Sequence, residues 1–171
     1  MKVNYFFTIM LCMVAFLSLQ AQELSEPGKL GVGLASSYPA YGLSAKYNFT
    51  ETHAAQLIVG GASYGFGTNS FALSGRYLYN FKENGDTFVY RPYVYGQLGY
   101  FTVKYQFLNY SESFNTISFG AGGGIEFTFP EFVKGLAFNA ELGYVGGSFE
   151  DGIGTYAGFA YGAGIHYYFN L

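Results

Sequence analysis

TISFGAGGGIEFTF, residues 116–129, alternates between two kinds of side chain. One face of this stretch is apolar, and its members are Ile117, Phe119, Ala121, Gly123, Ile125, Phe127 and Phe129. The opposite face is small or polar, and its members are Thr116, Ser118, Gly120, Gly122, Gly124, Glu126 and Thr128. A period of two residues is typical of a β-strand, and a glycine-rich face suits a crowded interior better than a solvated surface. The stretch therefore predicts a strand whose small face, with the carboxylate of Glu126, points inward.

The composition of the whole chain is unusual for a protein that faces water. Its 171 residues fit one domain, and they are 50% hydrophobic, 22% aromatic and only 11% charged. Soluble domains carry about 25% charged residues. The chain is too apolar for disorder. A net charge of −3, with basic residues scattered singly, gives no support for a nucleic-acid partner.

The N-terminus has the layout of a secretory signal peptide. Lys2 supplies a positive charge, Tyr5–Leu19 is an apolar core, and small residues follow where cleavage would occur. A membrane-anchoring helix is the alternative, but the run falls short of the roughly 20 apolar residues that a spanning helix needs. We therefore predict a cleavable signal peptide at 1–22 and a mature domain at 23–171. Because the single cysteine lies within the signal segment, the mature domain has no disulfide.

Segments with the same alternation recur along the mature chain and are separated by turn signals. We predict eight strands, over residues 29–36, 41–49, 54–64, 70–82, 87–105, 116–129, 136–146 and 156–171. The orientation of the fifth strand stays open, because Tyr and Phe fall on both of its faces. Longer loops are predicted at 106–115 and 147–155. Eight antiparallel strands are enough to close an up-and-down barrel with a filled interior, so the predicted fold class is all-β.

The charged residues indicate which face of such a barrel points outward. On the five strands with clear alternation, those that begin at residues 41, 70, 116, 136 and 156, the apolar face carries no Asp, Glu, Lys or Arg. A soluble barrel of lipocalin type shows charge to water. A transmembrane barrel shows its apolar face to lipid, and its closed ladder leaves no unpaired backbone group in the membrane. We therefore expect a transmembrane β-barrel, with a soluble periplasmic ligand-binding barrel as the less favoured alternative.

Phenylalanines gather near the strand ends that meet the tight turns or the C-terminus. On a barrel these positions form one ring, like the aromatic girdle at a membrane interface. The predicted girdle comprises Phe49, Phe81, Phe88, Phe127, Phe129, Phe138 and Phe169.

Two of the predicted strands resemble strands of a known superfamily. PYVYGQLGY at 92–100 and FGAGGGIEF at 119–127 are similar to strands of the small eight-stranded outer-membrane barrels of the OmpA/OmpX-like superfamily. The resemblance implies a Gram-negative outer membrane, both termini in the periplasm and insertion by the barrel-assembly machinery. It also implies contact with outer-membrane lipids and lipopolysaccharide, and we expect the barrel to be a monomer.

Isolated polar residues on the inward faces form a candidate interior network. Its members are Lys46, Arg76, Arg91, Glu126, Glu141 and His166. Buried charges are tolerated when they are paired. We therefore expect Glu126 to pair with Arg91 on the neighbouring strand, or with Arg76 or Lys46 across the lumen. A gate or proton-sensitive plug is possible chemistry for this set, but a salt-bridged core that fills the barrel is the favoured interpretation.

Catalysis, metal binding and cofactor binding are not expected. His166 has no serine nearby in the sequence to activate, and His53 lies in a predicted turn. Two separated histidines without a mature cysteine do not supply a metal site. The predicted role is structural or surface interaction, with the loops at 106–115 and 147–155 as candidate sites for an extracellular ligand. The alternative is a narrow channel or transporter for small solutes, including hydrophobic ones that pass through a side opening.

Overall fold

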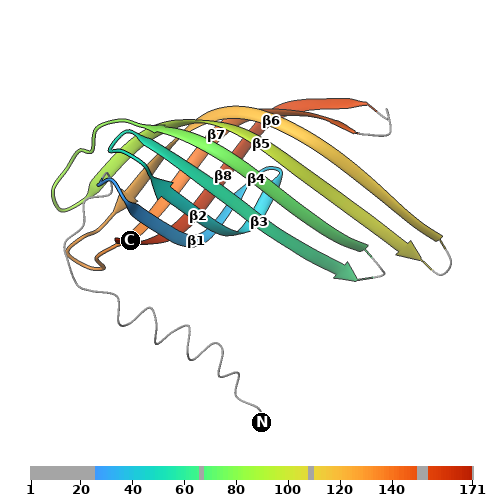
Figure 1. The fold of residues 1–171 in the computed structure, drawn as a ribbon, viewed down its shortest axis with the longest axis horizontal. Helices are drawn as coiled ribbons and strands as arrows, with labels where there is room; N and C mark the ends of the chain where they lie inside the picture. Colours follow the sequence, from blue (N-terminus) through green and yellow to red (C-terminus); the bar gives the residue numbers. More distant parts are fainter. Residues whose placement is uncertain (1–25, 66–67, 108–109, 150–153, 171) are drawn as a thin grey trace, which may run out of the picture.

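The computed structural model describes residues 26–65, 68–107, 110–149 and 154–170, which form a closed barrel of eight antiparallel strands (Figure 1). The strands are β1 (Lys29–Ser37), β2 (Ala40–Asn48), β3 (His53–Gly65), β4 (Thr68–Asn80), β5 (Val89–Phe107), β6 (Tyr110–Thr128), β7 (Leu136–Phe149) and β8 (Thr155–Asn170). Each strand pairs with its neighbours in the sequence, and β1 pairs with β8. The predicted all-β, eight-stranded up-and-down barrel is confirmed. The described residues contain no helix long and apolar enough to cross a membrane, and the predicted signal peptide at 1–22 lies outside them.

Side chains alternate between the lumen and the outer surface, and β4 shows this most clearly. From Ser70 to Asn80 every even-numbered residue is buried and every odd-numbered residue is exposed. The stretch at 116–129 follows the same rule, since Phe119 is 64% exposed on the outside whereas Glu126 is fully buried. The orientation of β5, which the sequence leaves open, follows from its register with β6. Arg91 lies opposite Glu126, and directly opposed residues of antiparallel strands point to the same face.

The hairpin formed by β5 and β6 is longer than the sequence indicates. Residues 110–115 are strand and pair with β5 throughout, so the predicted loop at 106–115 is wrong in extent. Residues 108–109 of that segment lie outside the described part of the chain. Polar residues weaken the hydrophobic signal of this segment, but cross-strand contacts stabilise the ladder. One of them joins the rings of Tyr105 and Phe114, whose centroids are 6.0 Å apart.

The predicted loop at 147–155 is also shorter in the structure. β7 continues to Phe149 and β8 begins at Thr155, and residues 150–153 lie outside the described part of the chain. Gly147, which reads as a loop residue, lies in the ladder opposite Tyr156. A Cβ at Gly147 would lie 2.6 Å from the Tyr156 ring, so the glycine here accommodates an aromatic neighbour inside a strand.

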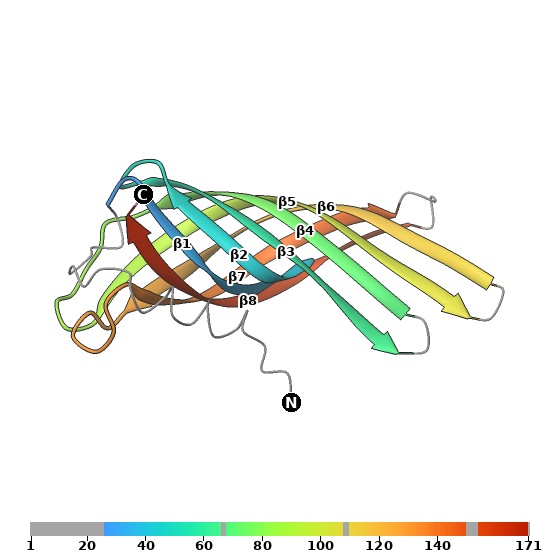
Figure 2. The ribbon, with the colours of Figure 1, turned by 60° about the horizontal axis from the view of Figure 1, so that its bottom comes forward.

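The two ends of the barrel differ. The barrel wall extends least far along the axis at β1 and β2, the two shortest strands (Figure 2). The termini and the turns after β2, β4 and β6 lie at one end, here called the terminal end; the other is the hairpin end. At the hairpin end β1 and β2 stop at a two-residue turn, Tyr38-Pro39, whereas β5 and β6 each contain 19 residues. β8 therefore pairs with β1 only up to Gly162, and β3 pairs with β2 only up to Val59. Among the described residues, 155–161 and 60–65 have no ladder partner on this side.

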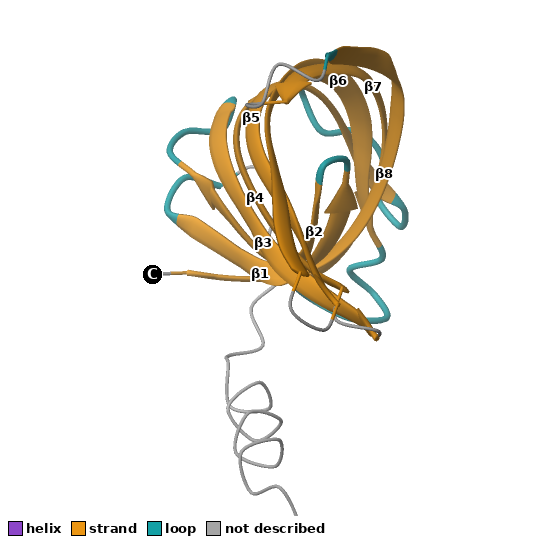
Figure 3. Cartoon of the chain, turned by 90° about the vertical axis from the view of Figure 1, so that its right-hand side faces the viewer, coloured by secondary structure: helices purple, strands orange, loops and turns teal. Residues whose placement is uncertain are grey.

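The β1–β2 turn folds inward and narrows the lumen at the hairpin end, which faces the viewer in Figure 3. Pro39 is buried, and the Gln97 side chain donates a hydrogen bond to the carbonyl oxygen of Tyr38 at 2.8 Å. A Cβ at Gly99 would lie 2.8 Å from the Pro39 ring, so glycine permits this close approach. An apolar cluster lies beside the turn and comprises Ala35, Ala40, Ile58 and Ala72, with Phe101 packed against it.

Candidate functional site: the polar network in the lumen

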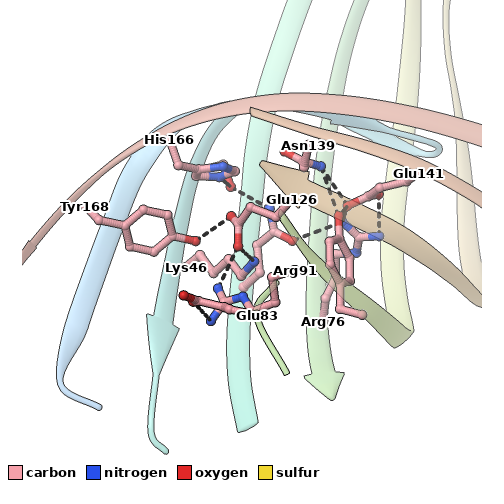
Figure 4. A network of polar contacts seen from close by, with 12 residues as sticks. Lys46, Arg76, Glu83, Arg91, Glu126, Asn139, Glu141, His166 and Tyr168 are labelled. Carbon is pink, nitrogen blue, oxygen red and sulfur yellow. Dashed lines mark hydrogen bonds and ion pairs between the residues drawn. The ribbon is translucent and has the colours of Figure 1, made fainter. Parts of the chain in front are cut away.

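Two buried glutamates, Glu126 on β6 and Glu141 on β7, organise the polar interior of the barrel (Figure 4). The structure places every predicted interior residue in the lumen, each at most 7% exposed: Lys46, Arg76, Arg91, Glu126, Glu141 and His166. These residues form two centres around the two carboxylates.

In the Glu126 centre, one carboxylate binds two cations. Glu126 Oε2 lies 2.6 Å from Arg91 Nη2 and 3.0 Å from Lys46 Nζ. Glu126 Oε1 accepts a hydrogen bond from the Tyr168 hydroxyl at 2.7 Å. Arg91 comes from the adjacent strand, whereas Lys46 reaches Glu126 from β2 across the lumen. Arg91 Nη1 also lies 3.9 Å from Glu83 Oε1, which connects this centre to the β4–β5 turn.

The Glu141 centre has one cation and a bidentate geometry. Arg76 Nη1 and Nη2 donate to Glu141 Oε1 and Oε2 at 3.0 and 2.7 Å. The Tyr93 hydroxyl and the Asn139 amide donate to Glu141 Oε1 at 2.5 and 3.0 Å. Arg76 lies on β4 and Glu141 on β7, so this pair also crosses the lumen. The sequence offers Arg76 as a partner for Glu126, and the structure assigns it to Glu141 instead.

Two tyrosines on β5 bring the centres into contact. Lys46 Nζ lies 4.8 Å from the centroid of the Tyr93 ring, and Arg76 Cζ lies 3.8 Å from that of Tyr95. At these distances a cation is attracted to the face of an aromatic ring. Tyr93 therefore belongs to both centres, because its ring lies beside Lys46 and its hydroxyl binds Glu141.

Glycines opposite the charged side chains provide the space that the network needs. Glu141 lies opposite Gly124 on β6 and opposite Gly162 on β8. A Cβ at Gly124 would lie 2.7 Å from the Tyr93 ring, and a Cβ at Gly162 would lie 3.0 Å from Glu141 Oε2. The small inner face of residues 116–129 thus has a packing function, because larger side chains there would displace the Glu141 centre.

The network contains three cations and two carboxylates, all removed from water. Each of Lys46, Arg76 and Arg91 has a carboxylate oxygen within 3.0 Å. Burying an unpaired ion costs several kcal/mol, and a close counter-charge with further hydrogen bonds offsets that cost. The arrangement is that of a salt-bridged core.

Comparisons with known proteins bear on the fold. No family model matches the sequence, and no curated protein matches it. The structure is similar to the crystal structure of the N-terminal β-barrel domain of Pseudomonas aeruginosa OprF, with a TM-score of 0.58. The two chains are 19% identical, and the match covers 84% of this chain and 98% of that domain. The two structures therefore share the same β-barrel fold. The recognition of this fold from the strands at 92–100 and 119–127 is thereby confirmed.

The lumen also contains a serine–histidine pair that sequence reasoning missed, because its members are 122 residues apart. His166 Nε2 lies 2.9 Å from Ser44 Oγ, which is the distance of an activated nucleophile and its base. Both side chains are at most 3% exposed, and Gln56 Nε2 donates to the same Ser44 Oγ at 2.9 Å. This pair has the surroundings of a packed core. The described residues contain no group of three or more His, Cys, Asp or Glu side chains that could hold a metal ion.

The predicted girdle residues lie on the outer face, at the terminal end of the barrel. Ring contacts join Phe127 to Phe88, Phe129 and Phe138, with centroids 5.7 to 6.2 Å apart. Phe49 and Phe81 directly follow β2 and β4 and contact tyrosines of those strands. Phe169 lies opposite Leu30 in the β1–β8 ladder. Sequence reasoning missed Phe132 in the β6–β7 turn, which is 80% exposed at the same end. Alternation carries no information about a residue outside a strand.

Proposed function

We propose that the chain is an integral outer-membrane β-barrel with a structural or surface-interaction role and a filled interior. One observation carries this proposal: large apolar side chains are exposed on the outer face of all eight strands. Examples from β1 to β8 are Leu34, Leu43, Leu57, Tyr77, Leu98, Phe119, Leu142 and Phe159. Soluble monomers rarely expose apolar patches above a few hundred Å², whereas a membrane barrel needs an apolar band all the way round. A soluble ligand-binding barrel would require the opposite arrangement.

The proposed location is the outer membrane of a Gram-negative cell, with both termini in the periplasm. The signal-peptide pattern at 1–22 supports export, and the similar OprF domain has the same barrel fold. The proposed partners are outer-membrane lipids and lipopolysaccharide on the outer face, and the barrel-assembly machinery during insertion. The barrel acts as a monomer.

The lumen is proposed to be closed to solutes and to have no catalytic role. The salt-bridged core and the apolar cluster beside the β1–β2 turn occupy successive levels of the interior. The buried surroundings of Ser44 and His166 leave no visible access for a substrate. Any interaction with an extracellular ligand is proposed to occur at the hairpin end, where the described parts of the two predicted loops lie: 106–107, 110–115, 147–149 and 154–155.

A narrow channel or transporter is the second candidate. The short barrel wall at β1 and β2 favours it, because it leaves neighbouring strands unpaired at the hairpin end. There, among the described residues, 60–65 of β3 have no ladder partner toward β2, and 155–161 of β8 have none toward β1. A small hydrophobic solute entering from the hairpin end would leave sideways at this point. Such a route would lie on the hairpin side of the polar network and would not cross it.

Conductance of the refolded protein in planar lipid bilayers separates the two candidates. We expect no steady conductance from the wild type, because the two centres and the apolar cluster fill the lumen. Stable single-channel steps would favour the channel instead. Heat-modifiable migration on gels and recovery in the outer-membrane fraction are expected for either candidate. A freely soluble protein would contradict both.

A further inference from the structure

The turn between β6 and β7 exposes apolar side chains outside the strands. Phe132 is 80% exposed and Val133 is 49% exposed. The backbone N–H groups of both residues donate to the carbonyl oxygen of Phe129, at 3.0 and 3.1 Å. These hydrogen bonds fold the turn into a compact loop. Its side chains and the start of β7 enclose a pocket of about 340 Å³, lined entirely by apolar residues: Phe129, Phe132, Val133, Leu136 and Phe138.

The neighbouring turns at the terminal end also expose phenylalanines, Phe49, Phe81 and Phe88, but each of these packs beside an outward tyrosine of the adjoining strand. A pocket of about 690 Å³ lies between the β2–β3 and β4–β5 turns, and its lining is largely polar. The charged residues of that lining are Glu51, Lys82, Glu83 and Asp86. The lining of this pocket therefore suits contact with water. By contrast, the pocket at the β6–β7 turn has no charged or polar residue in its lining.

The apolar pocket is continuous with the outward aromatic residues of the barrel. The ring centroid of Phe132 lies 6.4 Å from that of Phe129, which in turn lies 5.3 Å from that of Phe88. Phe138 forms the other wall of the pocket and stacks on Phe127, its partner in the ladder. The pocket therefore opens beside the face that the proposed function assigns to lipid.

Two charged residues beside the apolar side chains make the turn amphipathic. Lys134 is exposed next to Val133, and Glu131 is exposed next to Phe132. A lysine beside an apolar surface suits the boundary between headgroups and acyl chains, where its ammonium group meets lipid phosphate. A phospholipid offers both an apolar chain and an anionic phosphate, which matches this combination of side chains.

We propose that the β6–β7 turn anchors the barrel in the periplasm-facing leaflet, and that its pocket binds the acyl chain of a phospholipid. Phe132 and Val133 enter the leaflet, and Lys134 contacts the headgroup. The inference rests on the proposed membrane location. It adds a specific lipid contact to the outer face, which is otherwise a general apolar band.

The absence of tryptophan from the chain allows a direct test. Phe132→Trp introduces a single tryptophan, which can be excited selectively over the tyrosines. The refolded protein is studied in vesicles of phosphatidylethanolamine and phosphatidylglycerol with or without bromine on the acyl chains. We expect blue-shifted emission and strong quenching by the brominated lipid. Val133→Trp repeats the measurement from the same pocket, which covers the case in which the first variant does not refold. An additional Lys134→Gln change is expected to reduce the quenching in vesicles that contain phosphatidylglycerol.

Two matched variants separate failure of this inference from failure of the proposed function. Phe127→Trp reports on the lipid-facing girdle, and Asp86→Trp reports on the polar turn at the same end. Quenching of the Phe127 and Phe132 variants, but not of the Asp86 variant, supports the anchor. Quenching of the Phe127 variant alone overturns the anchor and keeps the membrane barrel. Absence of quenching in all of them overturns the membrane location.

Discussion

The Glu126 and Glu141 centres solve one problem, a buried carboxylate, in two ways. In the Glu126 centre a single oxygen, Oε2, binds both Lys46 and Arg91. In the Glu141 centre both oxygens bind one guanidinium, that of Arg76. The first arrangement concentrates positive charge around one acceptor, so its two cations depend on the same negative charge. The second forms two parallel hydrogen bonds between the planar guanidinium of Arg76 and the carboxylate of Glu141. This geometry fixes the orientation of the two side chains, with one positive charge for one negative charge.

The comparison predicts that Glu126→Gln has the largest effect. The amide keeps the shape but removes the charge that Lys46 and Arg91 share. Breaking a buried ion pair costs about 3–5 kcal/mol, and we expect this variant to reach the upper part of that range. Urea unfolding of the refolded barrel in lipid vesicles measures the change, with Glu131→Gln in the exposed β6–β7 turn as control. Equal stability of the two variants would contradict the paired-core interpretation.

Glu141→Gln is expected to have a smaller effect, because only one cation loses its counter-charge. Arg76 keeps its hydrogen bond to Gln56 at 3.0 Å, and the new amide oxygen still accepts from Tyr93. We expect a loss of about 3 kcal/mol, the lower end of the range for a broken buried pair. The same unfolding experiment applies. A loss larger than that of Glu126→Gln would reverse the ranking of the centres.

A glycine substitution tests the packing of the Glu141 centre without changing any charge. In Gly124→Ala the new methyl group would lie 2.7 Å from the Tyr93 ring and 2.8 Å from a backbone oxygen, which displaces a donor to Glu141. Overpacking of this kind costs about 1–3 kcal/mol. Gly96→Ala is the matched control, because a Cβ there meets nothing within 4 Å. Indistinguishable unfolding midpoints for the two variants would show that the inner glycines are not needed for space.

The alternating face pattern predicted much of this interior. Arg91 and Glu126 meet because they lie directly opposite on neighbouring strands, and a sequence with clear strands allows that inference. The pairing of Arg76 with Glu141 was not predictable in the same way. It joins β4 to β7, and the partner of a side chain across the lumen depends on the stagger and tilt of the closed barrel. Neither quantity can be derived from alternation.

Strand ends and turns account for the remaining differences. Residues 110–115 resemble a loop in composition, yet they pair because β5 continues beside them. Ser44 and His166 meet only because β1, which lies between their strands, is flanked by both. Phe132 lies outside any alternating segment. In each case the deciding contact is non-local, and local sequence carries little information about it.

The seam between β1 and β8 has a consequence for the order of folding. It runs from the Lys29–Asn170 pair to the Ser37–Gly162 pair, so it joins the two extremes of the described chain. Until that ladder forms, both strands present open edges, which are costly in hydrocarbon. In the proposed membrane location, a chain that lacks β8 would leave the edges of β1 and β7 unpaired in hydrocarbon. Closure of the barrel therefore requires both the first and the last strand of the described chain.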